Sequence, residues 1–311
     1  MRVAVVFPGQ GTQAPGMGAP WQDHPAWKIV ELAEAALGEP LAPLLLDTPA
    51  EGLARTREAQ LAVLCNSLIA WEAARLVLDD IVAFAGHSLG QVTALIAAGV
   101  LELEDGVRFA ARRAELTQSA ADAHPGRMAA LLGATIEQAE AACLAAPGGA
   151  WVANDNAPGQ VVIAGTPDGV DRAVARAKEL RVRRATPLAV GGAFHTPLMA
   201  SAREGLIDAI ATVPCADPCA PVVSNHDGAA YADGEGWRTR LPDHVTVPVR
   251  WRTSMQTLAG LGADAFVEVG HGSMIAGVAK RTLPDVPVLA CGSPAECEQL
   301  SRKSTPEEEN P

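Results

Sequence analysis

The sequence predicts an α/β fold in which a mainly parallel sheet carries a small inserted subdomain. Two observations indicate this fold. Short apolar runs that read as buried strands alternate with helical stretches over residues 1–126 and again over 193–297. Between them, residues 127–192 follow the order strand–helix–strand–strand–helix–strand, which forms a compact four-stranded sheet with two helices. We therefore expect a large subdomain from the two outer segments and a small one from the middle segment.

The expected elements of the outer segments alternate in type along the chain. The first is a strand over residues 2–9, which ends in the Gly-Pro-rich turn of "PGQGTQ". It is followed by helices over 27–37 and 59–78, a strand over 80–86, and helices over 89–101 and 103–122. After the insertion the α/β pattern resumes over 193–213, with strands over 221–228 and 265–270, a helix over 272–283 and a strand over 286–292.

The insertion and the chain end have patterns of their own. Within 127–192 we expect strands over 127–134, 150–158, 159–166 and 183–192, and helices over 135–146 and 167–181. Residues 298–311 are polar and charged, with little apolar surface to bury. We therefore expect this tail to be disordered.

The composition excludes several classes of function. The 311 residues are 49% hydrophobic and carry a formal net charge of −12, which suits a globular protein but not one that binds nucleic acid or an anionic membrane surface. The longest apolar stretch, residues 92–101, is too short to span a bilayer, and the chain start does not read as a signal peptide. We therefore expect a cytoplasmic protein whose six cysteines are reduced, with no metal site among them.

The first candidate for chemistry is Ser88, in the stretch "GHSLG". This stretch fits the G-x-S-x-G nucleophile elbow and lies between an expected strand and an expected helix. A strand that turns sharply into a helix needs small residues two positions before and after the turn residue. The serine is then exposed in a strained conformation at the helix N-terminus, where the backbone N–H of Leu89 points at a developing oxyanion. The alternative is a tight packing turn with an idle serine.

A serine nucleophile needs a base, and seven histidines are available. His87 is adjacent to Ser88, and neighbouring residues in an elbow point apart. His195 lies in "GGAFHTPLM", where a Gly-rich strand end meets a helix start, so its imidazole can be presented into a cleft. A carboxylate that would complete a triad cannot be assigned, and the position of His195 in the middle of the chain argues against an ordinary esterase.

A group of short motifs, together and in this order, resembles the malonyl-CoA:acyl carrier protein transacylases and the acyltransferase domains of polyketide synthases. The motifs are "FPGQGTQ", "GHSLG", Arg113 in "AARRAEL", "NDNAPGQVVIAG", "GAFHTPLM", "VPVRW" and "EVGHGSM". The resemblance covers about residues 1–295. It implies a hydrolase-like α/β core with an inserted ferredoxin-like subdomain and an active site in the cleft between them.

The resemblance also implies the catalytic roles. Ser88 would be acylated by malonyl-CoA, and His195 would act as general base and then as general acid. A backbone carbonyl in the "PVRW" segment, near Arg250, would orient the imidazole in place of a triad carboxylate. The backbone N–H groups of Gln10 and Leu89 would form the oxyanion hole. No metal and no organic cofactor is implied, since the substrate is a coenzyme A thioester and the partner carries the phosphopantetheine.

The substrate residues implied by the resemblance are Arg113, Gln60 and Phe194. The guanidinium of Arg113 would bind the free carboxylate of the malonyl group through two parallel hydrogen bonds. An acetyl group would leave this cation unpaired, a penalty of roughly 2–5 kcal/mol. Arg112 beside it is expected to face solvent. Phe194, before the catalytic histidine, favours malonyl over methylmalonyl, because its ring fills the space of an α-methyl group.

The resemblance leaves the partner and the pathway partly open. A monomer that binds an acyl carrier protein is expected, with "RVRR" (residues 181–184) and Lys280–Arg281 as candidate docking patches. Gln91, His271 and Ser273 depart from the common family pattern. Fatty-acid synthesis, polyketide synthesis and a malonate-decarboxylase subunit are not separated. The alternatives to transfer are an acyl-thioester hydrolase that edits misloaded carriers and a non-catalytic docking subunit.

Overall fold

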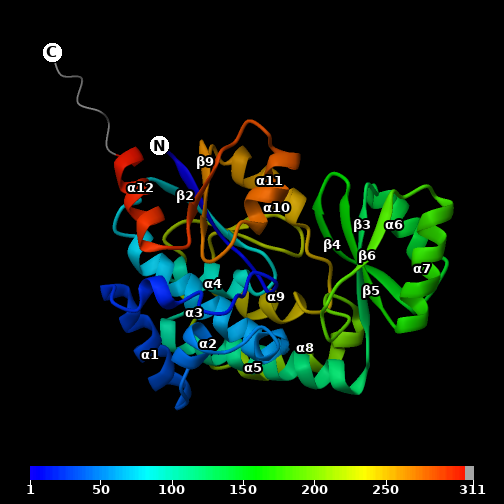
Figure 1. The fold of residues 1–311 in the computed structure, drawn as a ribbon, viewed down its shortest axis with the longest axis horizontal. Helices are drawn as coiled ribbons and strands as arrows, with labels where there is room; N and C mark the ends of the chain where they lie inside the picture. Colours follow the sequence, from blue (N-terminus) through cyan, green and yellow to red (C-terminus); the bar gives the residue numbers. More distant parts are fainter. Residues whose placement is uncertain (305–311) are drawn as a thin grey trace.

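The computed structural model describes residues 1–304, which form two sheets of different size (Figure 1). The large sheet has the order β10-β9-β1-β2-β7-β8, and its strand pairs are parallel except for β7 with β8. Its strands are β1 (Val3–Phe7), β2 (Ile81–Gly86), β7 (Val222–Val223), β8 (Ala230–Tyr231), β9 (Ala265–Val269) and β10 (Val288–Cys291). The mixed α/β class with a mainly parallel sheet is therefore confirmed.

Helices cover both faces of the large sheet because its strands are apolar on both sides. Along β1, Val3, Val5 and Phe7 pack in one buried cluster, while Ala4 and Val6 pack in another. The first cluster includes side chains of α1, α3, α4, α5 and α8, and the second includes those of α10 and α11. The helices are α1 (Lys28–Leu37), α2 (Ala42–Leu46), α3 (Thr56–Ala74), α4 (Gly90–Ala97), α5 (Leu103–Ala123), α8 (Ala200–Ile210), α9 (Trp237–Asp243), α10 (Trp251–Gly260), α11 (Met274–Thr282) and α12 (Pro294–Ser304).

The small sheet is antiparallel and has the strand order β4-β5-β3-β6. Helices α6 and α7 pack on its outer face, at one end of the molecule (Figure 1). Its inner face presents Met128 and Val162 toward Phe194. The elements are β3 (Arg127–Leu132), α6 (Ile136–Cys143), β4 (Ala150–Ala157), β5 (Gln160–Gly165), α7 (Pro167–Glu179) and β6 (Arg184–Pro187). The order of elements expected over 127–192 is confirmed.

Strand β4 joins the small sheet to the segment of the large subdomain that precedes α10. Asn154 forms a parallel bridge with Val249, and the backbone N–H of Asp155 donates to the carbonyl oxygen of Val249 at 2.9 Å. The Asp155 carboxylate also pairs with Arg252 of α10 at 2.9 Å. The inner face of the small sheet is therefore held against the large subdomain by backbone as well as side-chain contacts.

Two expectations about the C-terminal part are wrong. Residues 298–304, expected to be disordered, belong to α12, because Cys297 and Leu300 bury one side of the helix. Cys297 is also joined to Cys291 by a disulfide, so these two cysteines are not free thiols. The rest of the expected tail, 305–311, lies outside the described residues. No helix within residues 1–304 is long and apolar enough to cross a membrane.

Candidate active site

Ser88 lies at the turn between β2 and α4, with a backbone φ of 53°. Such a positive φ is rare for a residue with a side chain, and it marks a strained conformation. The flanking glycines permit the turn. A Cβ atom on Gly86 would lie 1.8 Å from the carbonyl oxygen of Gly90, and one on Gly90 would lie 2.3 Å from that of Phe7. The geometry of the "GHSLG" stretch is therefore that of a nucleophile elbow.

His195 contacts the serine directly. Its Nε2 atom lies 2.7 Å from Ser88 Oγ, and its Nδ1 atom lies 2.8 Å from the backbone carbonyl oxygen of His244. A carbonyl only accepts hydrogen bonds, so Nδ1 carries the proton and Nε2 is free to accept one from the serine hydroxyl. Burial, with the nearby charge of Arg113, lowers the pKa of His195 to about 3. The imidazole is therefore neutral at pH 7, as a general base must be.

The assignment of the imidazole-orienting carbonyl to Arg250 is wrong. The backbone N–H of Arg250 donates to the carbonyl oxygen of Asn225 at 2.8 Å, and its own carbonyl accepts from Ser254 at the start of α10. The carbonyl that accepts from the imidazole belongs to His244, six residues earlier, at the end of α9. No side-chain pattern marks such a residue, because every residue type carries the same backbone carbonyl.

Arg113 reaches the site from α5 and is 7% exposed. One guanidinium nitrogen donates to Gln60 Oε1, and Nη2 donates to Ser88 Oγ at 3.3 Å. Within residues 1–304, no carboxylate forms an ion pair with this guanidinium. Burial lowers the pKa of Arg113 to about 10, so the side chain stays charged at pH 7. A buried cation without an anion is costly, and this one is placed to receive an anionic ligand.

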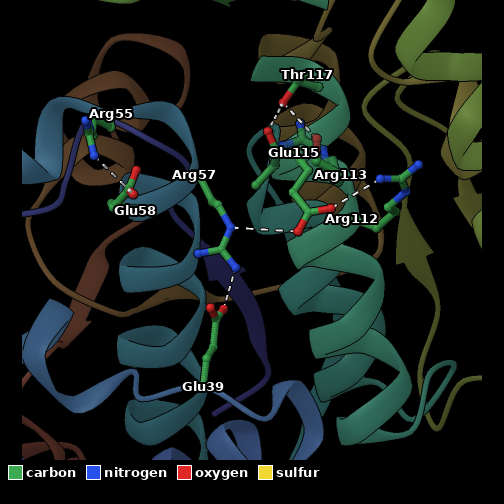
Figure 2. Close-up of polar contacts among 9 residues, drawn as sticks. Glu39, Arg55, Arg57, Glu58, Arg112, Arg113, Glu115 and Thr117 are labelled. Atoms are coloured by element: carbon green, nitrogen blue, oxygen red, sulfur yellow. Dashed lines mark hydrogen bonds and ion pairs between the residues drawn. The ribbon is translucent and has the colours of Figure 1, made fainter. Parts of the chain in front are cut away.

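Figure 2 shows the contact of Arg112, the neighbour of Arg113 on α5, with Glu115 of the same helix. Arg112 pairs with Glu115 at 3.2 Å and its side chain is 52% exposed, whereas Arg113 is buried. Thr117, one turn after Arg113, donates to the Arg113 carbonyl at 2.8 Å and accepts from Gln60 Nε2 at 3.3 Å. The same threonine therefore fixes the glutamine that contacts the guanidinium.

The residues expected at the site line one cavity of about 190 Å³ between the two sheets, with the exception of Arg250. Leu89 follows Ser88 and Gln10 lines the same cavity, and within residues 1–304 the backbone N–H of neither donates a hydrogen bond. Both are therefore free to face an oxyanion. The lining consists of Gln10, Gln60, His87, Ser88, Leu89, Arg113, Met128, Asn154, Asn156, Gln160, Val162, Leu188, Val190, Phe194, His195 and Met274.

Some of the lining residues were not expected from the sequence. His87 does not contact the serine hydroxyl; its Nε2 atom lies 2.9 Å from Asn156 Oδ1 across the cavity. Asn156 and Asn154 lie on β4, in the "NDN" stretch, where strand alternation places both on one face of the strand. Met274, at the start of α11, closes another part of the wall. These residues lie in the motifs "GHSLG", "NDNAPGQVVIAG" and "EVGHGSM", but the motifs alone assigned them no role in the site.

The sequence profile of the acyl transferase domain matches residues 4–297. The chain belongs to this acyl transferase family. Among its relatives is the malonyl CoA-acyl carrier protein transacylase of Salmonella typhimurium, 36% identical over 94% of this chain and 96% of that protein. The Bacillus subtilis protein of the same name is 34% identical over 99% of both chains. The resemblance deduced from the motifs is therefore confirmed.

Solved structures of acyl transferases agree over nearly the whole fold. An acyl-carrier-protein S-malonyltransferase from Burkholderia pseudomallei superposes with a TM-score of 0.93 at 34% identity, covering 97% of this chain and 100% of that one. A malonyl-transacylase solved in complex with a type II polyketide synthase acyl-carrier protein superposes with a TM-score of 0.93 at 31% identity, with the same coverage. This chain is similar to both across its two sheets.

Proposed function

We propose that this acyl transferase moves a malonyl group from malonyl-CoA to the phosphopantetheine thiol of an acyl carrier protein. The single observation that carries the proposal is the position of Arg113, a buried guanidinium that lies 3.3 Å from the hydroxyl of Ser88 and has no acidic partner in the part of the chain that the structure describes. An acyl group bound to this serine would need a carboxylate of its own to balance the charge. Malonyl provides one, two carbons from the thioester carbonyl. The names of the relatives support the same substrate.

The first half-reaction uses the contacts of Ser88. Its hydroxyl proton passes to Nε2 of His195 as Oγ attacks the thioester carbonyl, and the His244 carbonyl stabilises the imidazolium through Nδ1–H. The backbone N–H groups of Gln10 and Leu89 would stabilise the oxyanion. The carbon–sulfur bond then breaks, and coenzyme A leaves with the proton from His195. The malonyl ester of Ser88 remains.

The second half-reaction repeats these steps with a different thiol. The phosphopantetheine thiol of the carrier protein gives its proton to His195 and attacks the ester carbonyl. The bond between Ser88 Oγ and the acyl carbon breaks, and the serine recovers a proton from His195. Every bond and proton is accounted for by the chain and its two thiols, so the proposal needs no metal and no organic cofactor.

Phe194 supports malonyl over larger acyl groups. It is half-buried, lines the cavity directly before the base, and packs against the inner face of the small sheet. A cavity of about 190 Å³ suits a short acyl group, and the phenyl ring that lines it beside the base would take up space that an α-methyl branch needs. We therefore propose that the ring excludes methylmalonyl.

We propose that the carrier protein docks at the mouth of this cavity. Arg183 of the "RVRR" patch and Arg281 line one surface cavity of about 350 Å³, so the two patches expected from the sequence meet in space. Arg281 also donates to Gln160 Oε1 at 2.8 Å, and Gln160 lines the active-site cavity. Adjacent guanidinium groups suit the phosphate of a phosphopantetheine arm and an acidic carrier surface.

We further propose the finer architecture implied by the family. Residues 1–126 and 193–297 would form the hydrolase-like core, and 127–192 the ferredoxin-like subdomain. The strand order β4-β5-β3-β6 with two helices on one face supports the latter. We propose a cytoplasmic monomer that binds neither nucleic acid nor membrane, in keeping with its net charge of −12.

The proposal is tested by intact-mass measurement after brief mixing with malonyl-CoA or with acetyl-CoA. We expect wild type to gain a malonyl adduct, Ser88→Ala to gain none, and Arg113→Ala to lose the preference for malonyl. Arg112→Ala is the matched control, because its side chain lies on the solvent side of the same helix, and it should behave as wild type. Release of free malonate as fast as the ester forms would instead establish the editing hydrolase. If neither thioester forms an adduct, the remaining alternative is that the protein is a non-catalytic docking subunit.

A further inference from the structure

Asn225 holds the turn that presents Ser88. Its side-chain Oδ1 accepts from the backbone N–H of Ser88 at 2.7 Å, and its Nδ2 donates to the carbonyl oxygen of Gly86 at 2.7 Å. One side-chain amide therefore bonds the residue at the turn and the glycine two positions before it. Asn225 is 2% exposed, so water does not compete for these two bonds.

These contacts continue the sheet beyond the point where backbone pairing ends. Strand β7 pairs with β2 only through Val222 with Phe84 and Val223 with Ala85. After Ala85 the β2 chain approaches the elbow and turns away. Asn225, two residues past the end of β7, supplies an acceptor and a donor from its side chain where a longer strand would supply a backbone carbonyl and an N–H.

The backbone of Asn225 is itself held from two sides. The backbone N–H of Asn225 donates to Gln91 Oε1 at 3.0 Å, and its carbonyl accepts from the backbone N–H of Arg250 at 2.8 Å. Gln91 is fully buried on the first turn of α4, directly after the elbow. Helix α4, which follows Ser88, therefore fixes Asn225 through Gln91, and Asn225 in turn fixes Ser88. This gives a role to Gln91, one of the positions that departs from the common family pattern.

We propose that Asn225 is a positioning residue for the nucleophile, an inference that rests on the proposed role of Ser88. By fixing the serine N–H, it keeps the backbone at a φ of 53°. That conformation aims Oγ at Nε2 of His195 and leaves the N–H of the next residue, Leu89, directed at the reacting carbonyl. Without the amide, the strained turn relaxes and the reacting atoms separate.

The competing explanation is that Asn225 only stabilises the fold. Ser254 offers a matched control, because it is a fully buried polar residue close by whose Oγ lies 3.1 Å from the Arg250 carbonyl oxygen and 3.5 Å from that of Ser224. Among the hydrogen bonds of residues 1–304, none joins it to Ser88. Ser254→Ala should lower the melting temperature without changing the chemistry. A residue that positions the nucleophile must change the reactivity of the serine as well.

The test is the rate at which a fluorophosphonate labels Ser88. Oγ bonds to phosphorus, fluoride leaves, and the hydroxyl proton passes through His195 to water, so labelling reports the nucleophile independently of any acyl substrate. We expect Asn225→Ala to be labelled about 100-fold more slowly than wild type, because small displacements of reacting atoms cost rates of this order. Its KM for malonyl-CoA should stay within about threefold of wild type while kcat falls. Ser254→Ala should be labelled at the wild-type rate.

A folded Asn225→Ala protein that is labelled within about threefold of the wild-type rate would overturn the proposal. If that variant does not fold, Asn225→Asp serves in its place, since it keeps the shape and the acceptor for the Ser88 N–H but loses the donor to Gly86. We expect it to be labelled about tenfold more slowly, and labelling at the wild-type rate would again overturn the proposal. An unlabelled wild type would refute Ser88 as nucleophile, and with it the proposed function.

Discussion

The Nδ1 atom of His195 lies 2.8 Å from the backbone carbonyl oxygen of His244, so a main-chain group occupies the place that a carboxylate has in a Ser-His-Asp triad. A carbonyl fixes the tautomer and the ring orientation as a carboxylate would, but it carries no full charge. The imidazolium formed during acyl transfer is consequently stabilised less. The base is oriented by a residue whose side chain takes no part in the contact.

The first prediction concerns that carbonyl. His244→Gln leaves the backbone in place and removes a buried ring whose Nε2 atom lies 3.2 Å from Ser224 Oγ. We expect a loss of stability of about 1–3 kcal/mol and a kcat within about tenfold of wild type. His195→Ala should lower kcat by at least about 10³-fold. Thermal melts and steady-state rates check both, and equal losses of kcat in the two variants would contradict the backbone role.

The second prediction concerns pH. Burial lowers the pKa of His195 to about 3, below the ordinary value of 6.5. The base stays neutral as the pH falls through 6.5, so kcat/KM should not decline there. The profile is measured from pH 4.5 to 8 with a malonyl thioester that lacks the phosphates of coenzyme A, because these titrate in the same range. A decline centred near pH 6.5 would show that His195 titrates as an exposed histidine.

The third prediction concerns the pH dependence of stability, which follows from the two buried histidines His195 and His244. Burial lowers the pKa of His244 to about 3 as well. Below pH 6.5 the unfolded chain binds protons at both positions while the folded protein does not, so the free energy of unfolding falls as the pH drops from about 6.5 toward 3. Each histidine contributes at most about 1.4 kcal/mol per pH unit. Urea melts of wild type and of His244→Gln should differ in this slope.

The fourth prediction concerns Thr117, which accepts from Gln60 Nε2 at 3.3 Å. Thr117→Val keeps the shape of the side chain but leaves the glutamine amide without its acceptor. We expect the KM for malonyl-CoA to rise several-fold and the preference for malonyl over acetyl to fall, at a cost of about 1–3 kcal/mol in stability. Competition between the two thioesters, read by intact mass, measures the preference.

Thr93→Val is the control for that substitution. Thr93 is fully buried on α4, and within residues 1–304 its hydroxyl has no hydrogen-bond partner. Removal of an unsatisfied buried hydroxyl should raise the free energy of unfolding by about 1 kcal/mol and leave the acyl preference unchanged. Loss of the preference in Thr93→Val would mean that any change of a buried threonine disturbs the site.

The fifth prediction concerns Phe194. Phe194→Ala removes the ring that lines the cavity beside His195. We expect the rate of acylation by methylmalonyl-CoA to rise relative to that by malonyl-CoA. Intact-mass competition between the two thioesters checks this, and an unchanged ratio would show that another part of the wall excludes the branch.

The sequence predicted the residues whose side chains carry the chemistry and missed those that act by position. Ser88, His195 and Arg113 lie in short motifs whose spacing has a chemical reason, and the structure brings all three together. The contribution of His244 is a backbone oxygen, which no residue type encodes. Asn225 follows a strand of only two residues, and its contact with Ser88 spans 137 positions.

The fold was predicted in element order over residues 127–192, whereas the helices α2, α9 and α10 and the short strand β8 of the outer segments were not expected. The α/β pattern near 193–213 becomes a helix only from Ala200, because His195 adopts a φ of 61° and Pro197 opens a short 3₁₀ turn before it. At the other end, α12 contains so few apolar residues that its mean polarity indicated disorder. Burial of Cys297 and Leu300 against the rest of the protein decides its structure instead.

The oxygen of Ser88 has two lone pairs and one proton, and the site uses them separately. Arg113 donates to one lone pair at 3.3 Å, while the proton is directed at Nε2 of His195. A dicarboxylic thioester that draws the guanidinium toward its own carboxylate withdraws that donor and makes the oxygen more electron-rich as it attacks. With a monocarboxylic thioester, Arg113 continues to donate to Ser88 Oγ, and this hydrogen bond makes the oxygen a weaker nucleophile. Arg113 would then discriminate through kcat as well as through binding, so that the correct acyl group activates the residue that receives it.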